Sequence, residues 1–391
     1  MLNGLSQTSG GDLGAVLDAV TYLPTAGAVQ DAYKQISPDK AAALSTLSFA
    51  GAAMQLRNLA QRTTNLRFGG LEGSGSFGSG GLSCNYSRLD GLLLAYNGAS
   101  LGGLLSDQKA RAPENRFGVY LDYGGVFGSQ KSSLNQTGFA FTISGFTLGA
   151  DYRLRNNLIL GLASGYSNTA SGFRGSGGSV AANTWPINFY GAYFPGSAYA
   201  FGSLGYALNL FNLERGLNFG GISRSARRST TGHQFNAYGE TGYDLKVTRL
   251  VMTPTLTLAY SNLGIGAFSE SGANSLNLQV EGQTAASLQT GLGGRLAAPF
   301  KVGGARVTPQ VYASYQHEFS NSSRGLDARL SQAGSTFNFQ TDSPKRDFAL
   351  VGANVTANLT KRLSAQVNYN AELGRGNYTA HFVNAGIRWE F

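Results

Sequence analysis

The sequence predicts an all-β membrane protein, an antiparallel transmembrane β-barrel of about twelve strands preceded by helical segments. Three observations predict this fold. The chain is rich in glycine and poor in charge, with 55 Gly, 13% charged and 11% aromatic residues. From Asn115 onward, apolar and polar side chains alternate in segments of about ten residues, the length of a tilted membrane-spanning strand. The connections between these segments alternate between short and long, as in outer-membrane barrels.

The alternation is clearest near the end of the chain. In residues 363–373 the odd positions are apolar, from Leu363 to Leu373, and the even positions are polar, from Ser364 to Glu372. Each such segment therefore has one apolar and one polar face. Comparable segments begin near Phe117, Phe146, Leu158, Trp185, Tyr199, Phe235, Leu250, Ser287, Arg306, Phe348, Leu363 and Tyr378.

The connections then orient the barrel. The short ones include "RNN", "PGS", "VTR", "KVGG" and "TKR", and the long ones include "NTASGFRGSGGSVAAN" and the segment around "ERGLNFGGISRSARRSTTG". Short turns are typical of the periplasmic side, and an even strand count places both barrel ends there. Since no run approaches the roughly 18–20 apolar residues of a membrane-spanning helix, a closed sheet is the remaining way to pair every backbone group in hydrocarbon.

Composition excludes several other classes. The net charge is +9, but the basic residues are scattered, and the densest cluster, Arg224, Arg227 and Arg228, predicts a solvated or lipopolysaccharide-facing loop rather than a nucleic-acid site. The single cysteine, Cys84, excludes an intramolecular disulfide and a cysteine-based metal site. Met1 is not followed by a signal peptide, so an exported precursor would begin upstream of this chain.

The last segment, "HFVNAGIRWEF", is strand-like up to Phe391. Its polar face is expected to point into the lumen, and the strand has to pair with the first one to close the barrel. An aromatic side chain at this position fits the periplasmic membrane interface. The apolar face of the segment consists of Val383, Ala385, Ile387, Trp389 and Phe391.

These residues together resemble the C-terminal translocator domain of type V autotransporters. The resemblance covers residues 115–391 and rests on "GFTLGADYRL", "GHQFNAYGETGYDL", "TPTLTLAYSNL", "VTPQVYASYQHEF" and "YTAHFVNAGIRWEF" in this order. It implies a twelve-stranded barrel with an α-helix through its lumen, located in the bacterial outer membrane, that places an N-terminal passenger on the cell surface. It also implies the barrel-assembly machinery, periplasmic chaperones, lipopolysaccharide and the passenger as partners of a monomer, with the alternation ending in Phe391 as the assembly signal.

Three regions follow from this comparison and from the change in composition. Residues 1–67 form a helical passenger stub or linker, residues 68–114 a Gly/Ser-rich linker, and residues 115–391 the barrel. Two segments could supply the pore helix, 41–67 and one within 88–112, and the second is favoured because it is shorter and nearer to the barrel. Some family members cleave themselves at an Asn-containing junction, but Asn156-Asn157 falls in a short turn, so this activity is not carried over.

No catalytic motif is present. Gly11-Asp12-Leu13 faintly resembles an esterase block, but its nucleophilic serine is missing. His317 and His381 fall on the apolar phase of their strands, which leaves a barrel phospholipase as an enzymatic alternative and a passive outer-membrane channel as a second one. We expect no enzymatic activity, no cofactor and no metal.

Charged residues of both signs fall on the polar phase of the strands, where they can pair across the lumen or hold a helix. We predict in particular that Glu240 contacts the pore helix. The candidate residues that face the lumen or the plug are Asp122, Asp151, Arg153, Glu240, Asp244, Arg295, Arg388 and Glu390.

Overall fold

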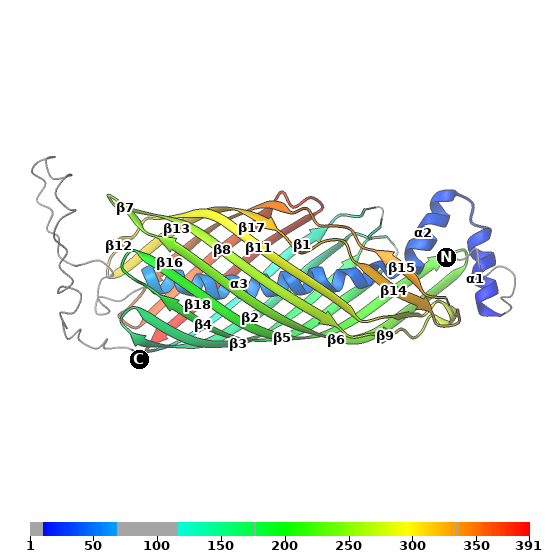
Figure 1. The fold of residues 1–391 in the computed structure, drawn as a ribbon, viewed down its shortest axis with the longest axis horizontal. Coiled ribbons are helices and arrows are strands. Elements are labelled where there is room, and N and C mark those ends of the chain that lie inside the picture. Colours follow the sequence, from blue (N-terminus) through cyan, green and yellow to red (C-terminus); the bar gives the residue numbers. More distant parts are fainter. Residues whose placement is uncertain (1–10, 69–115, 134, 176, 334) are drawn as a thin grey trace, which may run out of the picture.

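Closure of one long antiparallel sheet defines the fold (Figure 1). The computed structural model describes residues 11–68, 116–133, 135–175, 177–333 and 335–391. Strand β1 pairs with β18 over its whole length, from Gly118 opposite Glu390 to Gln130 opposite Tyr378, which closes the sheet into a barrel. Twelve spanning strands of the described residues follow one another around it, as the alternation predicts: β1 (Phe117–Gln130), β2 (Phe139–Arg155), β3 (Leu158–Phe173), β4 (Gly178–Tyr193), β5 (Ala198–Phe219), β6 (Ile222–Tyr243), β8 (Leu250–Ile265), β11 (Gln283–Ala297), β13 (Ala305–Glu318), β16 (Asp347–Asn358), β17 (Leu363–Leu373) and β18 (Tyr378–Glu390).

The two ends of the barrel differ. At the short-turn end, where Phe391 also lies, β7 (Leu245–Val247) and β12 (Phe300–Val302) extend neighbouring hairpins (Figure 1). At the long-loop end, β9 (Phe268–Ser269), β10 (Leu278–Val280), β14 (Gly325–Leu330) and β15 (Phe337–Gln340) form a separate sheet, which we call the loop sheet, beside the 3₁₀ helix η3 (Asn274–Leu276). The two ends differ in the way that the sequence predicts, with short turns at one end and most of the long connections at the other.

Two predicted long loops are wrong. Most of "NTASGFRGSGGSVAAN" (168–183) belongs to β3 and β4, which leaves only residues 174–177 between these strands. The segment around "ERGLNFGGISRSARRSTTG" forms the ends of β5 and β6, which run on beyond their neighbours and meet at Phe219 opposite Ile222. Gly220 and Gly221 make the two-residue turn, with φ of 53° and 80°. Glycine adopts these left-handed conformations without the steric cost that other residues bear, and such turns suit the twist of a hairpin. Arg227 and Arg228 therefore lie on a strand rather than in a loop.

The described residues before the barrel form four helical segments. They are α1 (Asp12–Thr21), α2 (Ala26–Ile36), the 3₁₀ turn η1 (Asp39–Ala42) and α3 (Ala43–Phe68). Helix α3 runs along the lumen, whereas α1 and α2 lie at the long-loop end (Figure 1). No helix within the described residues is both long enough and apolar enough to cross a membrane.

The favoured position of the pore helix has no support in this structure. We expect it from the sequence within residues 88–112, which lie outside the described residues, but the helix that contacts the barrel wall from inside is α3, in the earlier candidate segment. Within the described residues, the lumen helix is thus the earlier candidate segment, which runs from the long-loop end to the short-turn end. Its 26 residues span about 39 Å at 1.5 Å per residue.

The outer wall is apolar and the inner wall is polar, as the alternation requires. Large apolar side chains such as Leu148, Leu162, Leu256, Leu292 and Ile387 are exposed on the outside. His381 is also exposed, and it shares a 2.8 Å hydrogen bond with Tyr369. A belt of this kind matches hydrocarbon, which offers no hydrogen-bond partners.

Glycines in the wall make room for lumen-facing tyrosines. Gly161 of β3 lies directly opposite Tyr190 of β4, and a Cβ atom at Gly161 would come within 2.2 Å of Tyr190 Cζ. Gly149 faces Tyr120 in the same way, at 2.3 Å. Each tyrosine ring therefore lies flat across the neighbouring strand instead of filling the lumen that α3 occupies.

We predict that Gly161→Ala destabilises the refolded barrel by about 1–3 kcal/mol, because the Tyr190 ring has no free space into which it could move. The urea midpoint of unfolding, followed by heat-modifiable migration on gels, measures this. Gly172→Ala on the same strand is the control, since a Cβ atom there meets nothing within 4 Å. Equal midpoints for the two variants would contradict the prediction.

Candidate functional site: the helix–wall interface in the lumen

Helix α3 carries three arginines at intervals of five residues, Arg57, Arg62 and Arg67. Each guanidinium contacts one carboxylate of the barrel wall and lies over one aromatic ring. Guanidinium groups suit such places because they combine directed hydrogen bonds with stacking on a ring. We call the three places the upper, middle and lower arginine sites, with the upper one nearest to the long-loop end.

The middle site is the most buried of the three. Arg62 donates from Nε and Nη2 to Oδ2 of Asp151, at 2.7 and 2.5 Å, and its guanidinium carbon lies 5.2 Å from the Tyr120 ring centre. Both charged side chains are 2–3% exposed. Asp151 also accepts from Tyr190 at 3.1 Å and from Arg388 at 3.3 Å. Removing one partner of such a buried group leaves an uncompensated charge, which is strongly destabilising.

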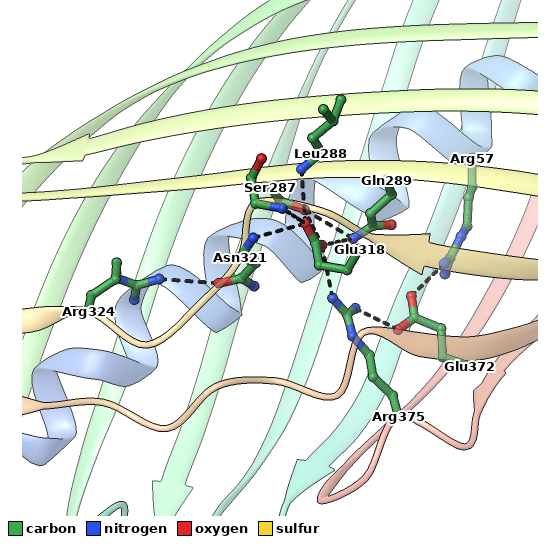
Figure 2. A network of polar contacts seen from close by, with 10 residues as sticks. Arg57, Ser287, Leu288, Gln289, Glu318, Asn321, Arg324, Glu372 and Arg375 are labelled. Carbon is green, nitrogen blue, oxygen red and sulfur yellow. Dashed lines mark hydrogen bonds and ion pairs between the residues drawn. The ribbon is translucent and has the colours of Figure 1, made fainter.

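The upper site belongs to a wider network, shown in Figure 2. Arg57 donates to Oε1 of Glu372 at 2.6 Å and lies 3.5 Å from the Phe382 ring centre. Glu372 also pairs with Arg375, which reaches Glu318 at 3.4 Å. Glu318 is fully buried and accepts hydrogen bonds from Ser287 Oγ and the Leu288 backbone N–H among others. The helix is thus connected through Glu372 of β17 and Arg375 to Glu318 of β13 and to Ser287 and Leu288 of β11.

The lower site lies at the short-turn end. Arg67 pairs with Asp244, just after β6, and its guanidinium carbon lies 3.8 Å from the centre of the Tyr199 ring. Thr253 of β8 also donates to Asp244, at 2.7 Å. Taken together, the three sites follow the wall from β17–β18 through β1–β2 to β5–β6, so the helix is held from several sides.

Apolar packing adds to this grip near the short-turn end. Leu59 and Leu66 of α3 are buried in one cluster with lumen-facing aromatic residues. The rings of Tyr120, Tyr190, Phe201 and Tyr238 form an arc along the wall, with successive ring centres 6.4, 6.1 and 6.0 Å apart. This arc closes the lumen around the helix on the side of β1 to β6.

Space remains on the other side of the helix. A cavity of about 280 Å³ near the long-loop end lies between Ser45 and Ala50 of α3 and Arg324 and Tyr378 of the barrel. A second cavity of about 130 Å³ continues from it at Ala53 toward Glu240 and Arg295. The helix is therefore off-centre, and small side chains face the open part of the lumen.

The predicted lumen residues can now be placed. Asp151 and Asp244 contact α3 directly, and Arg388 reaches Asp151 and pairs with Glu390. Asp122 accepts from Gln366 at 2.6 Å, and Arg153 is buried beside Asp151. Glu240 accepts from Tyr199 and Tyr238 and pairs with Arg295, all on the wall, so its contact with the helix stays a prediction.

Sequence reasoning missed the three helix arginines as well as Glu318, Glu372 and Arg375. The five-residue spacing of the arginines is a signal that could have indicated the first group. Glu372 falls on the polar phase of its strand and could have been added to the candidates. Arg375 and the contacts of Glu318 depend on how the long-loop connections fold, which alternation does not describe.

The long-loop end is covered by a cap, which we define as residues 11–42 (α1, α2 and η1). Leu13, Val16, Val20 and Ile36 are buried with apolar residues of the β5–β6 hairpin and the loop sheet. Arg215 of β5 is fully buried and donates to Glu270 and to the backbone oxygen of Gln35. At the start of α1, hydrogen bonds from Arg224 and Ser275 lower the pKa of Asp12 well below its ordinary value.

Lys40 is the exception among these charges. It is 1% exposed, and within the described part of the chain its Nζ has no hydrogen-bond partner. The ring of Phe173 lies 5.8 Å away, and Asp39, Arg215 and Glu270 are the charged groups around it. Burial lowers the pKa of Lys40 to about 8. The docked cap therefore holds a lysine in a place that disfavours its charged form.

Comparison with known proteins assigns this geometry to a family. A closed barrel with an apolar outer wall and a helix in its lumen is an outer-membrane barrel plugged by its own chain. The profile of the family described as "Autotransporter beta-domain" matches residues 96–370, and the chain belongs to this family. It is therefore an outer-membrane β-barrel of the autotransporter translocator type.

Solved translocator domains of autotransporters share the fold. The translocator domain of the autotransporter NalP from Neisseria meningitidis is 15% identical, with a TM-score of 0.57 over 74% of this chain and 93% of that one. The transport unit of AIDA-I from Escherichia coli is 17% identical, with a TM-score of 0.55 over 73% and 93%.

Curated relatives are longer than this chain. An extracellular serine protease of Serratia marcescens is 22% identical over 70% of this chain and 26% of its own length. The esterase EstA of Pseudomonas aeruginosa is 24% identical over 68% of this chain and 41% of its own. The chain thus spans less than half of each of these relatives.

We predict that Lys40→Met tightens the cap at pH 7.5 by about 1–3 kcal/mol, because it removes a buried charge without a hydrogen-bond partner. In the wild type the cap should become more stable as the pH rises from about 8 toward the ordinary lysine value near 10.4, since the unfolded segment then binds more protons than the docked one. The measurement is the subtilisin cleavage rate between α1 and α2, as a ratio of wild type to Lys40→Met.

This ratio should fall between pH 7.5 and pH 10. Lys34→Met, on the half-buried side of α2, is the control and should cleave like the wild type. A ratio that does not change with pH would show that the charge of Lys40 does not oppose docking.

Proposed function

We propose that this barrel exports a passenger that precedes α1, and that it then keeps the passenger attached at the cell surface with α3 as the plug. The observation that carries the proposal is the direction of α3. Its N-terminal end lies at the long-loop end and its C-terminal end at the short-turn end (Figure 1). Because short turns are periplasmic in outer-membrane barrels, the chain that precedes α3 emerges on the outer side.

The wall supports this role as a conduit rather than as a catalyst. Among the described residues, Glu372, Asp151 and Asp244 form ion pairs with α3, and Glu240 pairs with Arg295 of the wall. The described residues contain no group of three His, Cys, Asp or Glu that could hold a metal ion. We therefore propose that the barrel itself is not catalytic and that any enzymatic activity belongs to the passenger.

The remaining partners are proposals of the same kind. The apolar belt fits outer-membrane lipid, and the basic residues Arg227 and Arg228 on the long β5–β6 hairpin fit the phosphates of lipopolysaccharide. Assembly would use the barrel-assembly machinery and periplasmic chaperones. A monomer suffices, because β1 and β18 close the barrel within one chain.

The plug is tested by conductance and display. The chain is fused behind a signal peptide and an epitope, and it should expose the epitope on intact cells and conduct weakly in planar bilayers. Deleting residues 1–112 should raise the conductance strongly, since the lumen then loses α3. Deleting residues 11–36 alone is the matched control and should leave conductance low, because α3 remains. Large conductance of the intact chain would instead favour a passive channel.

A second test concerns Phe391 as part of the proposed assembly signal with Val383, Ala385, Ile387 and Trp389. Its ring is 58% exposed, with ring contacts to Phe117 and Trp389, so we expect it to contribute little to the stability of the folded state. Phe391→Ala should lower the outer-membrane yield in cells far more than it lowers refolding in detergent. Phe300→Ala, which removes another exposed ring at the same end, is the control. Equal losses in cells and in detergent would contradict a recognition role.

A further inference from the structure

The even spacing of the three helix arginines has a geometric consequence. Five residues of an α-helix correspond to a rise of about 7.5 Å and a rotation of about 140°. A screw motion of α3 by five residues therefore moves the Cα atom of each arginine onto the former position of the next one. The upper (Glu372, Phe382), middle (Asp151, Tyr120) and lower (Asp244, Tyr199) sites share the same chemistry, so each of them can take any of the three arginines.

The possible axial positions of α3, which we call its registers, differ in the number of sites that contain an arginine. In the observed register all three sites are filled. After a slip of five residues toward the short-turn end, Arg57 reaches the middle site and Arg62 the lower one, while Ala52 reaches the upper site. After a slip of five residues toward the long-loop end, Arg62 reaches the upper site and Arg67 the middle one. Either slip leaves one site without an arginine, and an unpaired carboxylate in the lumen is costly.

We infer that the three sites act as a register scale for α3 and thereby set the depth at which export of the chain stops. This inference rests on the proposed function and adds positioning residues to it. As the helix is drawn outward, Arg57 meets the lower, middle and upper sites in turn, with one, two and finally three sites filled. Movement beyond the last register again loses a pair, so the helix is held from both directions.

The scale makes an unusual prediction about the two partners of one ion pair. Without Arg67, the observed register and the slip toward the short-turn end both fill two sites. Without the Asp244 carboxylate only the upper and middle sites remain. The observed register and the slip toward the long-loop end both fill these two sites. Arg67→Ala and Asp244→Asn remove the same ion pair, yet they should let the helix slip in opposite directions.

Crosslinking to Thr147 reads the register. Thr147 of β2 is buried against α3, where it donates to Gln55 at 2.7 Å. In a Cys84→Ser background, Thr147→Cys is combined with Gln55→Cys, Ala50→Cys or Ala60→Cys, and cells that express the full chain are treated with a short bifunctional thiol reagent. Position 55 reports the observed register, position 50 the slip toward the short-turn end, and position 60 the slip toward the long-loop end.

Arg67→Ala should raise the 50–147 crosslink at least about tenfold over the wild-type background, and Asp244→Asn should do the same for the 60–147 crosslink, since each removes the one ion pair by which the arginine sites favour the observed register over that slip. Only heat-modifiable, folded barrels are scored, so a variant that fails to fold does not count as a slip. If both variants raise the same crosslink, or if folded barrels of both show only the 55–147 product, the register scale is wrong.

Epitope display by the wild type is measured in the same cells. Loss of display there would overturn the proposed export function, whereas normal display with unchanged crosslinks in both variants would overturn only the register scale.

Discussion

The pairing of β1 with β18 is the constraint on which the rest of the structure depends. In hydrocarbon every backbone N–H and C=O has to find a partner within the protein, so a sheet that spans the membrane has to close. Closure gives the lumen a fixed wall, and the alternation of side chains makes that wall polar. A polar wall enclosed by an apolar belt contains carboxylates that need counterions. Helix α3 supplies them at Glu372, Asp151 and Asp244.

The ion pairs specify the position of the helix more than they stabilise it. Taking two charges out of water costs about as much as their attraction returns, but losing one partner is severe. The wall also provides partners of its own, such as Arg388 for Asp151 and Arg375 for Glu372. Positive charge in the lumen is therefore not supplied by α3 alone. Each arginine site is complete only when a guanidinium lies between a carboxylate and a ring at the right depth.

Much of the barrel could be predicted from the sequence, because the period of two is a direct consequence of strand geometry. The alternation from Leu363 to Leu373 indicates both the strand and its inward face, and Asp122, Asp151 and Glu240 could be assigned to the lumen by phase alone. The β5–β6 hairpin could not, because a long Gly/Ser/Arg segment is compatible with a loop as well as with strands that extend beyond the membrane.

The sequence also could not decide which of the two candidate segments forms the helix in the lumen. Nearness to the barrel along the chain does not indicate which helix enters it, whereas matching arginines to wall carboxylates does. That matching requires the depth of each strand residue, which depends on register and tilt. The cap could not be predicted from the sequence either, because the burial of Lys40 and Arg215 arises from loops that fold over the helices.

The cap and the register of α3 are physically linked, because η1 continues directly into the helix. Asp39 of η1 accepts hydrogen bonds from Thr137, at 3.0 Å from its backbone nitrogen and 2.5 Å from its hydroxyl, and Arg324 donates to Ser45 at 2.5 Å. A slip of five residues would carry both contacts about 7.5 Å along the axis and break them. The cap can therefore dock fully only in the register that fills all three arginine sites. Ion pairs deep in the lumen thus determine whether the cap closes the long-loop end of the barrel. The axial position of α3 couples cap docking at one end of the barrel to the Arg67–Asp244 pair at the other end.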